Sequence, residues 1–230
     1  MSTVTEAVLH RHSTRAFTPR PVEQRLLREI IEVARYSPSS GNLQPWKLLV
    51  LAGHALEQLK DEVDNTLATK PRGEGMGYPI YPENLKPQYQ DRRGQCAQDL
   101  YATLGVARND REGRAKQFAR NFRFFDAPVG MILTIDRSMG TGQWADLGMF
   151  LQTLMLLAQE RGLATCAQAC WTLVHETVER QLELPADMMV FCGIALGYPD
   201  QDHPINTLRT VRESALEIAE FRGFQNTGEQ

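Results

Sequence analysis

Cysteine is scarce in this chain, which has four in 230 residues: Cys96, Cys166, Cys170 and Cys192. Thiols this few and scattered exclude a disulfide framework, so we expect them to be reduced. Cys166 and Cys170 stand close to His175, but a zinc site needs a second well-spaced pair, which is lacking. We therefore expect no metal and interpret the cysteines as small buried hydrophobic residues.

Long hydrophobic runs and a large net charge are also lacking. No apolar stretch approaches the length of a membrane span, and the opening residues lack the basic-then-apolar pattern of an export signal. We therefore expect a cytoplasmic protein with no membrane partner. The formal net charge is -3, which excludes the global positive field of a nucleic-acid-binding protein. The length and the 42% hydrophobic content are typical of one ordinary domain, expected to span residues 1–230.

Most motifs that identify an enzyme are missing. There is no P-loop, no G-x-S-x-G elbow and no H-E-x-x-H. Gly140, Gly142 and Ala145 match the dinucleotide fingerprint G-x-G-x-x-A, but about five residues separate them from the preceding expected strand, where the fingerprint needs an immediate turn. A plain turn at a helix start is the better interpretation.

Hydrophobic periodicity predicts a mixture of helices and strands. Thr3 and Glu6 have the spacing of a capping box, which predicts a helix over residues 3–11. Residues 71–94 are rich in proline and glycine, which predicts a long irregular segment or lid. Further helices are expected over residues 21–36, 55–70, 110–125, 144–162 and 172–182, and strands over residues 47–51, 129–135 and 189–196, before a tail over residues 197–230 anchored by Phe221 and Phe224.

Two of the expected helices have distinctive faces. The helix over residues 144–162 is apolar almost all round, so either the domain or a second subunit must cover it. The helix over residues 110–125 sets three phenylalanines opposite Lys116, Arg120 and Arg123. These cations either form a solvated face or attract an anionic nicotinamide or substrate. A surface that binds nucleic acid is the remaining alternative.

Arg11, His12, Ser13 and Arg15 form the first constellation that suggests chemistry. They lie where a helix gives way to an extended segment, in which alternate side chains project to one side. Guanidinium forks with hydroxyl donors are typical of phosphate sites. A solvated basic turn is the alternative.

Residues 39–46 form the second constellation. Ser39, Ser40, Asn42 and Gln44 place hydroxyl and amide groups beside Trp46, an arrangement that suits a polar heteroaromatic ligand. A simple turn with capping side chains is the alternative.

Together these stretches resemble the FMN-dependent nitroreductase family. The resemblance rests on Arg11-x-Ser13-x-Arg15 and on Pro38 to Trp46, and it continues over much of the chain. Similar landmarks are Ala127-Pro128-Val129, Asp146-Leu147-Gly148, Gly162 to Gln168, and Gly193 to Tyr198 with Arg209 behind it. The subgroup that it most resembles contains nitrobenzoate and nitrophenol reductases. Residues 55–123 carry no such landmark.

The resemblance implies an α+β three-layer fold with a mixed central sheet flanked by helices, in an intertwined homodimer with FMN at the interface. Carried over residue by residue, Arg11, Ser13 and Arg209 would hold the FMN phosphate, and Arg15 would lie at the flavin edge that becomes negative on reduction. Ala167 and Gln168 would pass the N5 edge, where a proline and an acidic residue are the commoner pattern. The candidate cofactor-binding residues are Arg11, His12, Ser13, Arg15, Pro38, Ser39, Ser40, Asn42, Gln143, Ala167, Gln168 and Arg209.

The implied activity is transfer of hydride from NAD(P)H through tightly bound FMN to an electron-poor substrate such as a nitroaromatic or quinone, with ping-pong kinetics. No catalytic side chain is expected, because the cofactor carries the chemistry. The alternatives on the same scaffold are a flavin reductase, an ene-reductase, a dehalogenase or an oxygen-dependent flavin-cleaving enzyme. A non-catalytic FMN-binding protein is the alternative outside enzymes.

Overall fold

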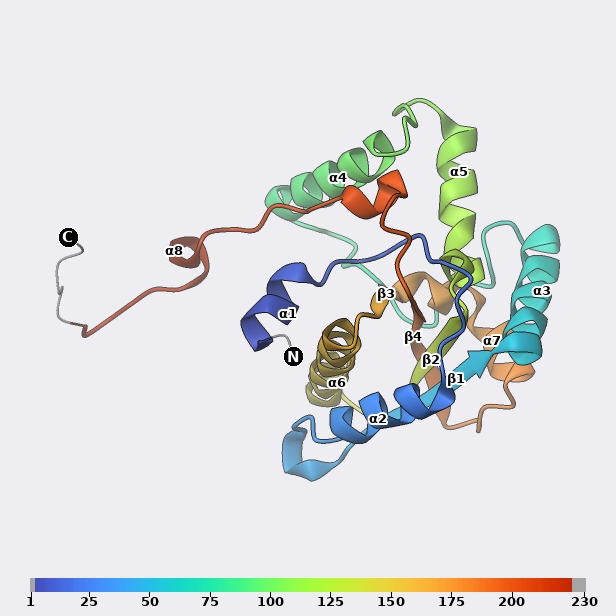
Figure 1. The fold of residues 1–230 in the computed structure, drawn as a ribbon, viewed down its shortest axis with the longest axis horizontal. Coiled ribbons are helices and arrows are strands. Elements are labelled where there is room, and N and C mark those ends of the chain that lie inside the picture. Colours follow the sequence, from blue (N-terminus) through green and yellow to red (C-terminus); the bar gives the residue numbers. More distant parts are fainter. Residues whose placement is uncertain (1–2, 225–230) are drawn as a thin grey trace.

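A four-stranded sheet with the strand order β1–β2–β4–β3 forms the centre of the molecule (Figure 1). The computed structural model describes residues 3–224. Neighbouring strands run antiparallel, and the pairing of β2 with β4 shifts register between Leu133 and Thr134. The strands span Trp46–Ala52 (β1), Val129–Asp136 (β2), Ala164–Gln168 (β3) and Met188–Gly197 (β4).

The expectation of a mixed sheet is wrong for these four strands. Within residues 3–224, parallel pairing is limited to an isolated bridge between Ser13 and Thr165, where the Thr14 N–H donates to the Thr165 carbonyl at 3.0 Å. The N–H of Arg15 bonds to the side chain of Asn206. The bridge does not extend into a parallel strand.

Helices cover both faces of the sheet, so the three-layer α+β architecture is confirmed (Figure 1). The α-helices span Val4–His10 (α1), Gln24–Ala34 (α2), Gly53–Thr69 (α3), Pro87–Ala102 (α4), Arg111–Ala119 (α5), Thr141–Glu160 (α6), His175–Gln181 (α7) and Ala215–Ile218 (α8). Short 3-10 turns span Ser40–Asn42 (η1), Arg120–Asp126 (η2), Ala169–Val174 (η3) and Pro204–Thr207 (η4).

The start of the chain confirms the predicted capping box. The Thr3 hydroxyl accepts from the N–H of Glu6 at 3.2 Å, and the Glu6 carboxylate accepts from the N–H of Thr3 at 2.7 Å. Both donors lie in the first turn of α1, where no backbone acceptor is within reach. The reciprocal pair therefore determines where α1 begins.

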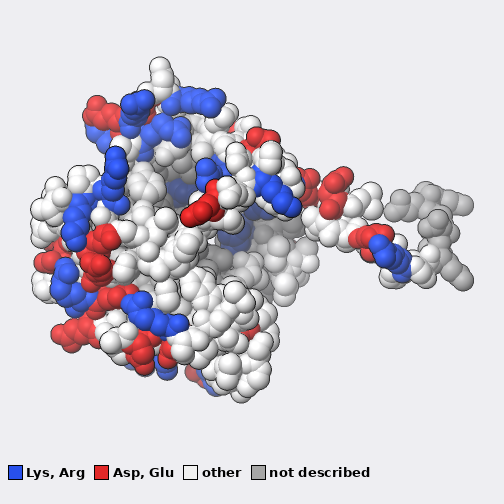
Figure 2. Space-filling model, turned by 180° about the vertical axis from the view of Figure 1, so that it is seen from behind, with Lys and Arg blue, Asp and Glu red and all other residues white. Residues whose placement is uncertain are grey.

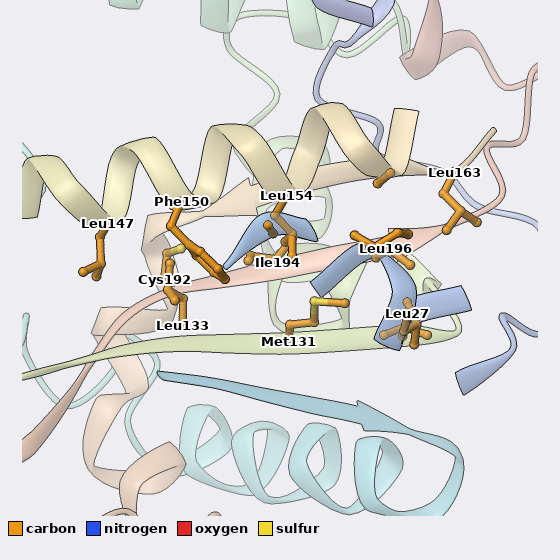
Figure 3. Packing of buried hydrophobic residues seen from close by; sticks show 14 of the residues in the cluster. Leu27, Met131, Leu133, Leu147, Phe150, Leu154, Leu163, Cys192, Ile194 and Leu196 are labelled. Carbon is orange, nitrogen blue, oxygen red and sulfur yellow. The ribbon is translucent and has the colours of Figure 1, made fainter. Parts of the chain in front are cut away.

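Two hydrophobic clusters lie on opposite faces of the sheet. One packs α2 and α6 on the sheet, and the other packs α3, α7, η2 and η3 against the opposite face. Alternate residues of β2 divide between them: Met131 and Leu133 belong to the first cluster and Ile132 to the second. Figure 3 shows the first cluster, in which α6 contributes Leu147, Phe150 and Leu154.

The apolar helix α6 is covered on one side only by the described chain. Leu147, Phe150 and Leu154 are fully buried. On the other side Met149 is 39% exposed, and Leu156 is half-buried. A helix that is apolar all round needs cover on every side, so this surface calls for a further partner.

Residues 71–94 are only partly irregular, because α4 begins at Pro87 and continues beyond this range. Proline lacks the N–H that a first helical turn cannot use, so Pro87 starts the helix rather than prolonging the loop. No residue of α4 is buried. The preceding segment is attached to the body: Glu74 accepts from the backbone and hydroxyl of Thr177, and its side chain is 3% exposed.

The aromatic helix is shorter than expected. It ends at Ala119, after which Phe124 and Phe125 adopt left-handed backbone with φ of 51° and 53°. Both rings are fully buried. Burial of two aromatic side chains offsets the cost of this backbone conformation.

The chain after Gly197 runs along the molecule and then away from it (Figure 1). Its expected anchors, Phe221 and Phe224, are 65% and 75% exposed, and their rings contact each other at 5.8 Å between centroids. They do not anchor the tail to its own subunit. The part of the predicted tail beyond Phe224 lies outside the described residues.

Candidate functional site

The amino-terminal and carboxyl-terminal segments meet through one buried asparagine. Asn206, 6% exposed, accepts from the backbone N–H of Arg15 at 2.8 Å and donates to the carbonyl of Ala16 at 2.9 Å. It also donates to the carbonyl of Asp200 at 2.7 Å. The bonds to Arg15 and Ala16 join residues 191 and 190 positions apart and place Arg209, three residues further on, beside the first constellation.

A cavity of about 560 Å³ opens at this junction. It lies between the segment after α1, the middle of α6 and the residues that follow η4, and four arginines contribute to its lining. Figure 2 shows Lys and Arg side chains in the hollowed part of one face of the molecule. The polar lining residues include Arg11, His12, Ser13, Arg15, Gln152, Arg209, Thr210 and Arg212.

The cavity carries positive charge without a protein counter-ion. Within residues 3–224, no carboxylate lies within ion-pair distance of Arg11, Arg15, Arg209 or Arg212. Their hydrogen bonds go to oxygen atoms without charge: Arg209 donates to the carbonyl of Asn206 at 2.9 Å. Such a cluster supplies both the charge and the forked donors that an anion needs.

The arginines also perturb one another. Burial is the main cause that lowers the pKa of Arg11, and the nearby charge of Arg212 lowers it further. Burial likewise lowers the pKa of His12, helped by Arg209, Arg11 and Arg15. A bound dianion would relieve this repulsion. The cavity therefore fits a phosphate group.

The second constellation lies elsewhere on the same chain. The backbone N–H of Ser40 donates to the buried carboxylate of Asp146 at 3.2 and 3.3 Å, so residues 38–42 sit near the start of α6. Gln152 of the cavity is six residues further along that helix, roughly 9 Å at 1.5 Å per residue. Within residues 3–224, Pro38, Ser39, Ser40 and Asn42 do not line the arginine cavity.

The three remaining candidates have other contacts. The side-chain carbonyl of Gln143 accepts from the N–H of Gly140 at 3.3 Å and caps α6. Gln168 donates to the Asn121 carbonyl at 2.7 Å, while its own side-chain oxygen is buried without a partner in the described chain. Ala167 is half-buried next to it in β3.

A second cavity, of about 540 Å³, adjoins the first and shares Arg15 and Cys96 with it. It lies between α4 and the α5–η2 segment. Four aromatic residues contribute to its walls, and two further arginines reach it from α4. The other lining residues are Tyr81, Arg92, Arg93, Ala97, Leu100, Tyr101, Gln117, Phe118, Asn121 and Phe125.

Three residues of the site were not among the predicted site residues: Arg212, which lines the first cavity, Asn206, which joins the segments around it, and Asp146, which holds the second constellation. Nothing in the sequence distinguishes Asn206 and Asp146 from other polar residues. Only the structure shows that both are buried. Arg212 could have been identified from the sequence as a further candidate, because it lies three residues after Arg209.

The basic side chains of the predicted basic face, Lys116, Arg120 and Arg123, line neither of these two cavities. Arg123 pairs with Asp64 at 2.8 Å and with Glu57 at 3.2 Å, and Lys116 pairs with Glu112 at 2.8 Å. These surface ion pairs bear out the interpretation as a solvated face, although Phe118 on the aromatic side remains 45% exposed.

The cysteines are free thiols, but the interpretation of all four as buried is wrong for Cys96, which is exposed on α4. Burial raises the pKa of Cys166 and raises the pKa of Cys170 to about 12. Neutral buried thiols are poor nucleophiles. No group of metal-ligating side chains occurs among the described residues. No helix in residues 3–224 has the length and hydrophobicity to cross a membrane.

Comparisons with known proteins agree with this geometry. The sequence model of the nitroreductase family matches residues 8–198. Nitrobenzene nitroreductase of Ectopseudomonas oleovorans is 36% identical over 221 residues, 96% of each chain, and 4-nitrobenzoate reductase of Pseudomonas putida is 37% identical over 94% of each. The crystal structure of the FMN- and NADPH-dependent nitroreductase NfnB from "sphigopyxis sp. strain HMH" superposes with a TM-score of 0.94 at 42% identity, covering 97% of this chain and 100% of that one. The chain belongs to the nitroreductase family.

Proposed function

We propose that this chain is an FMN-dependent oxidoreductase that transfers hydride from NAD(P)H to electron-poor aromatic compounds, nitroarenes above all. The observation that carries the proposal is the cavity in which four arginines gather without a protein counter-ion. Relatives named as nitroreductases, and a solved one described as FMN- and NADPH-dependent, support it.

Arg11, Ser13, Arg209 and Arg212 hold the phosphate of FMN in this proposal. Guanidinium forks supply paired hydrogen bonds as well as charge. His12 lines the same cavity, and the lowered pKa keeps its ring neutral near pH 7. These groups bind and orient the cofactor, and none of them exchanges a proton with substrate.

Arg15 lines both cavities. Its guanidinium donates to the Ser13 carbonyl at 3.1 Å and lies 6.0 Å from the Phe125 ring centroid. These contacts hold a permanent cation between the phosphate end and the aromatic cavity. Bound FMN would supply the hydride chemistry, and the fixed cation of Arg15 would stabilise negative charge on a ring held there.

We propose a homodimer as the active form. The chain exposes 14367 Å², about 3,900 Å² more than a compact monomer of its mass. Two copies together therefore have more excess surface than the roughly 2,000–5,000 Å² that an obligate interface buries in total. Exposed apolar residues are concentrated on α1 and on the carboxyl-terminal segment, where Leu9 and Leu216 are 73% and 81% exposed.

The second copy supplies what the single chain lacks at the cavity. We assign to it Pro38, Ser39, Ser40 and Asn42, whose loop is exposed in the single chain. Ala167, Gln168 and Gln143 remain proposed neighbours of the flavin ring. Both hydrophobic clusters share one sheet, which supports a single domain for each copy.

The test starts with purified protein. It is expected to be yellow, to release FMN on heating, and to sediment as a dimer at micromolar concentration. NADPH is expected to bleach the bound flavin without oxygen, and a nitroarene to restore the colour. Protein that takes up no FMN would overturn the proposal, and flavin that NAD(P)H does not bleach would leave an FMN-binding protein without this activity. Parallel assays with an enone, a halophenol and free flavin separate the other reductases of the same scaffold.

A further inference from the structure

The second cavity has a composition suited to an aromatic reactant. Tyr81, Tyr101, Phe118 and Phe125 contribute rings to its walls. The Phe118 ring contacts the Phe122 ring at 5.8 Å between centroids, yet Phe118 is still 45% exposed, which is a large exposure for an aromatic side chain. An aromatic compound in this cavity would cover that ring.

One face of α4 forms a further wall of the cavity. Arg93, Cys96, Ala97 and Leu100 of α4 all line the cavity, at spacings of three, four and seven residues that place them on a single helix face. None of them is buried. The arginine is thus presented to whatever enters between α4 and α5.

Three arginines reach this cavity, and two of them are engaged elsewhere. Arg92 forms an ion pair with Glu213 at 2.6 Å. Arg15 also lines the phosphate cavity. Arg93 has no carboxylate within ion-pair distance in the described chain; its guanidinium lies 4.9 Å from the centroid of the Tyr81 ring.

Acidic side chains are absent from this cavity among residues 3–224. Asp91 and Asp99, the acidic residues of α4, line a different cavity with the segment that contains Glu213. An anionic group on a reactant would therefore meet the uncompensated guanidinium of Arg93, with Arg15 at the boundary to the first cavity, and no opposing carboxylate.

We propose that Arg93 is a specificity-determining residue that favours nitroarenes carrying a carboxylate over neutral nitroarenes. The inference rests on the proposed function, which by itself leaves this choice open: the relatives include both nitrobenzene and 4-nitrobenzoate reductases. A guanidinium stacked on Tyr81 has its fork held in place, so that it can donate two parallel hydrogen bonds to a carboxylate.

The test compares the FMN-loaded wild-type protein with Arg93→Gln on two substrates, 4-nitrobenzoate and its methyl ester. Because an exposed ion pair contributes up to about 1 kcal/mol, or about fivefold, kcat/KM for the acid is expected to fall about fivefold, while that for the ester changes less than twofold. Arg111→Gln removes the same charge from the exposed start of α5, outside the cavity, and is expected to change neither value.

Binding without turnover gives an independent measurement. Benzoate and benzamide have matching shapes and no nitro group, so calorimetric titration of the oxidised holoenzyme reports recognition alone. Arg93→Gln is expected to weaken benzoate binding about fivefold, the same exposed-pair factor, and to leave benzamide binding unchanged. Glu213→Gln tests the opposite sign: it removes the charge that neutralises Arg92, so it is expected to strengthen benzoate binding.

The outcomes distinguish this inference from the proposed function. Equal losses for acid and ester in Arg93→Gln, or no loss, would overturn the role of Arg93 while leaving the nitroreductase activity in place. A changed preference between NADPH and NADH with an unchanged acid-to-ester ratio would assign Arg93 to the nucleotide phosphate instead, and would also overturn it. If the FMN-loaded wild-type protein reduced neither the ester nor the acid, the proposed function itself would be contradicted.

Discussion

Replacing Asn206 with alanine tests whether one buried amide assembles the site. After this change the N–H of Arg15 has lost its acceptor, and the carbonyls of Ala16 and Asp200 have each lost a donor. At about 1 kcal/mol for each hydrogen bond, the free energy of unfolding is expected to fall by about 3 kcal/mol. For a chain of this length that corresponds to a melting temperature lower by roughly 6–12 °C.

The same change is expected to weaken FMN binding, because the segments that carry Arg15 and Arg209 would no longer be hydrogen-bonded to each other through Asn206. Thermal unfolding of the apoprotein, followed by circular dichroism, measures the first effect, and fluorescence titration with FMN measures the second. Asn65→Ala, on an exposed position of α3, is the matched control and is expected to alter neither. Asn206→Ala protein with unchanged melting and unchanged FMN affinity would refute the assignment of Asn206 as the connection between the two segments.

Four further predictions concern individual side chains. Arg11→Ala combined with Arg209→Ala is expected to yield folded but colourless protein, and retained flavin would contradict the phosphate assignment. Arg15→Met is expected to keep FMN and lower its reduction potential, because the reduced ring loses a stabilising cation; spectroelectrochemistry at constant pH measures this. Asp146→Ala is expected to cost about 1–3 kcal/mol, since the Ser40 N–H loses its acceptor, and faster hydrogen exchange at that amide would show it. Since the folded-state pKa of His12 is depressed, the apoprotein is expected to lose stability as pH falls below about 6.5; His12→Gln should lessen this loss in denaturant titrations at pH 5.5 and 7.5.

The secondary structure followed from local patterns where the physics is local. The capping box at Thr3 and Glu6 needs only residues three apart, and the strand at β2 shows itself as a continuous apolar run. Strand β3 was missed, since its five residues carry no alternation of their own and acquire a partner only through β4. The first half of helix α4 falls in the segment expected to be irregular for a similar reason: the helix buries nothing, so its sequence has no hydrophobic periodicity.

The candidate site divides in the same way. The sequence by itself determined the chemistry of the amino-terminal constellation, since Arg11, Ser13 and Arg15 stand close enough together to indicate an anion site. Local patterns could not determine that the carboxyl-terminal segment brings Arg209 and Arg212 to that cavity, or that Arg93 lines the second cavity from α4. Side chains so far apart in the chain become neighbours only through packing. Only the tertiary structure decided those distances, through a buried amide that bridges the two ends of the chain and through ion pairs that neutralise some arginines and leave others free.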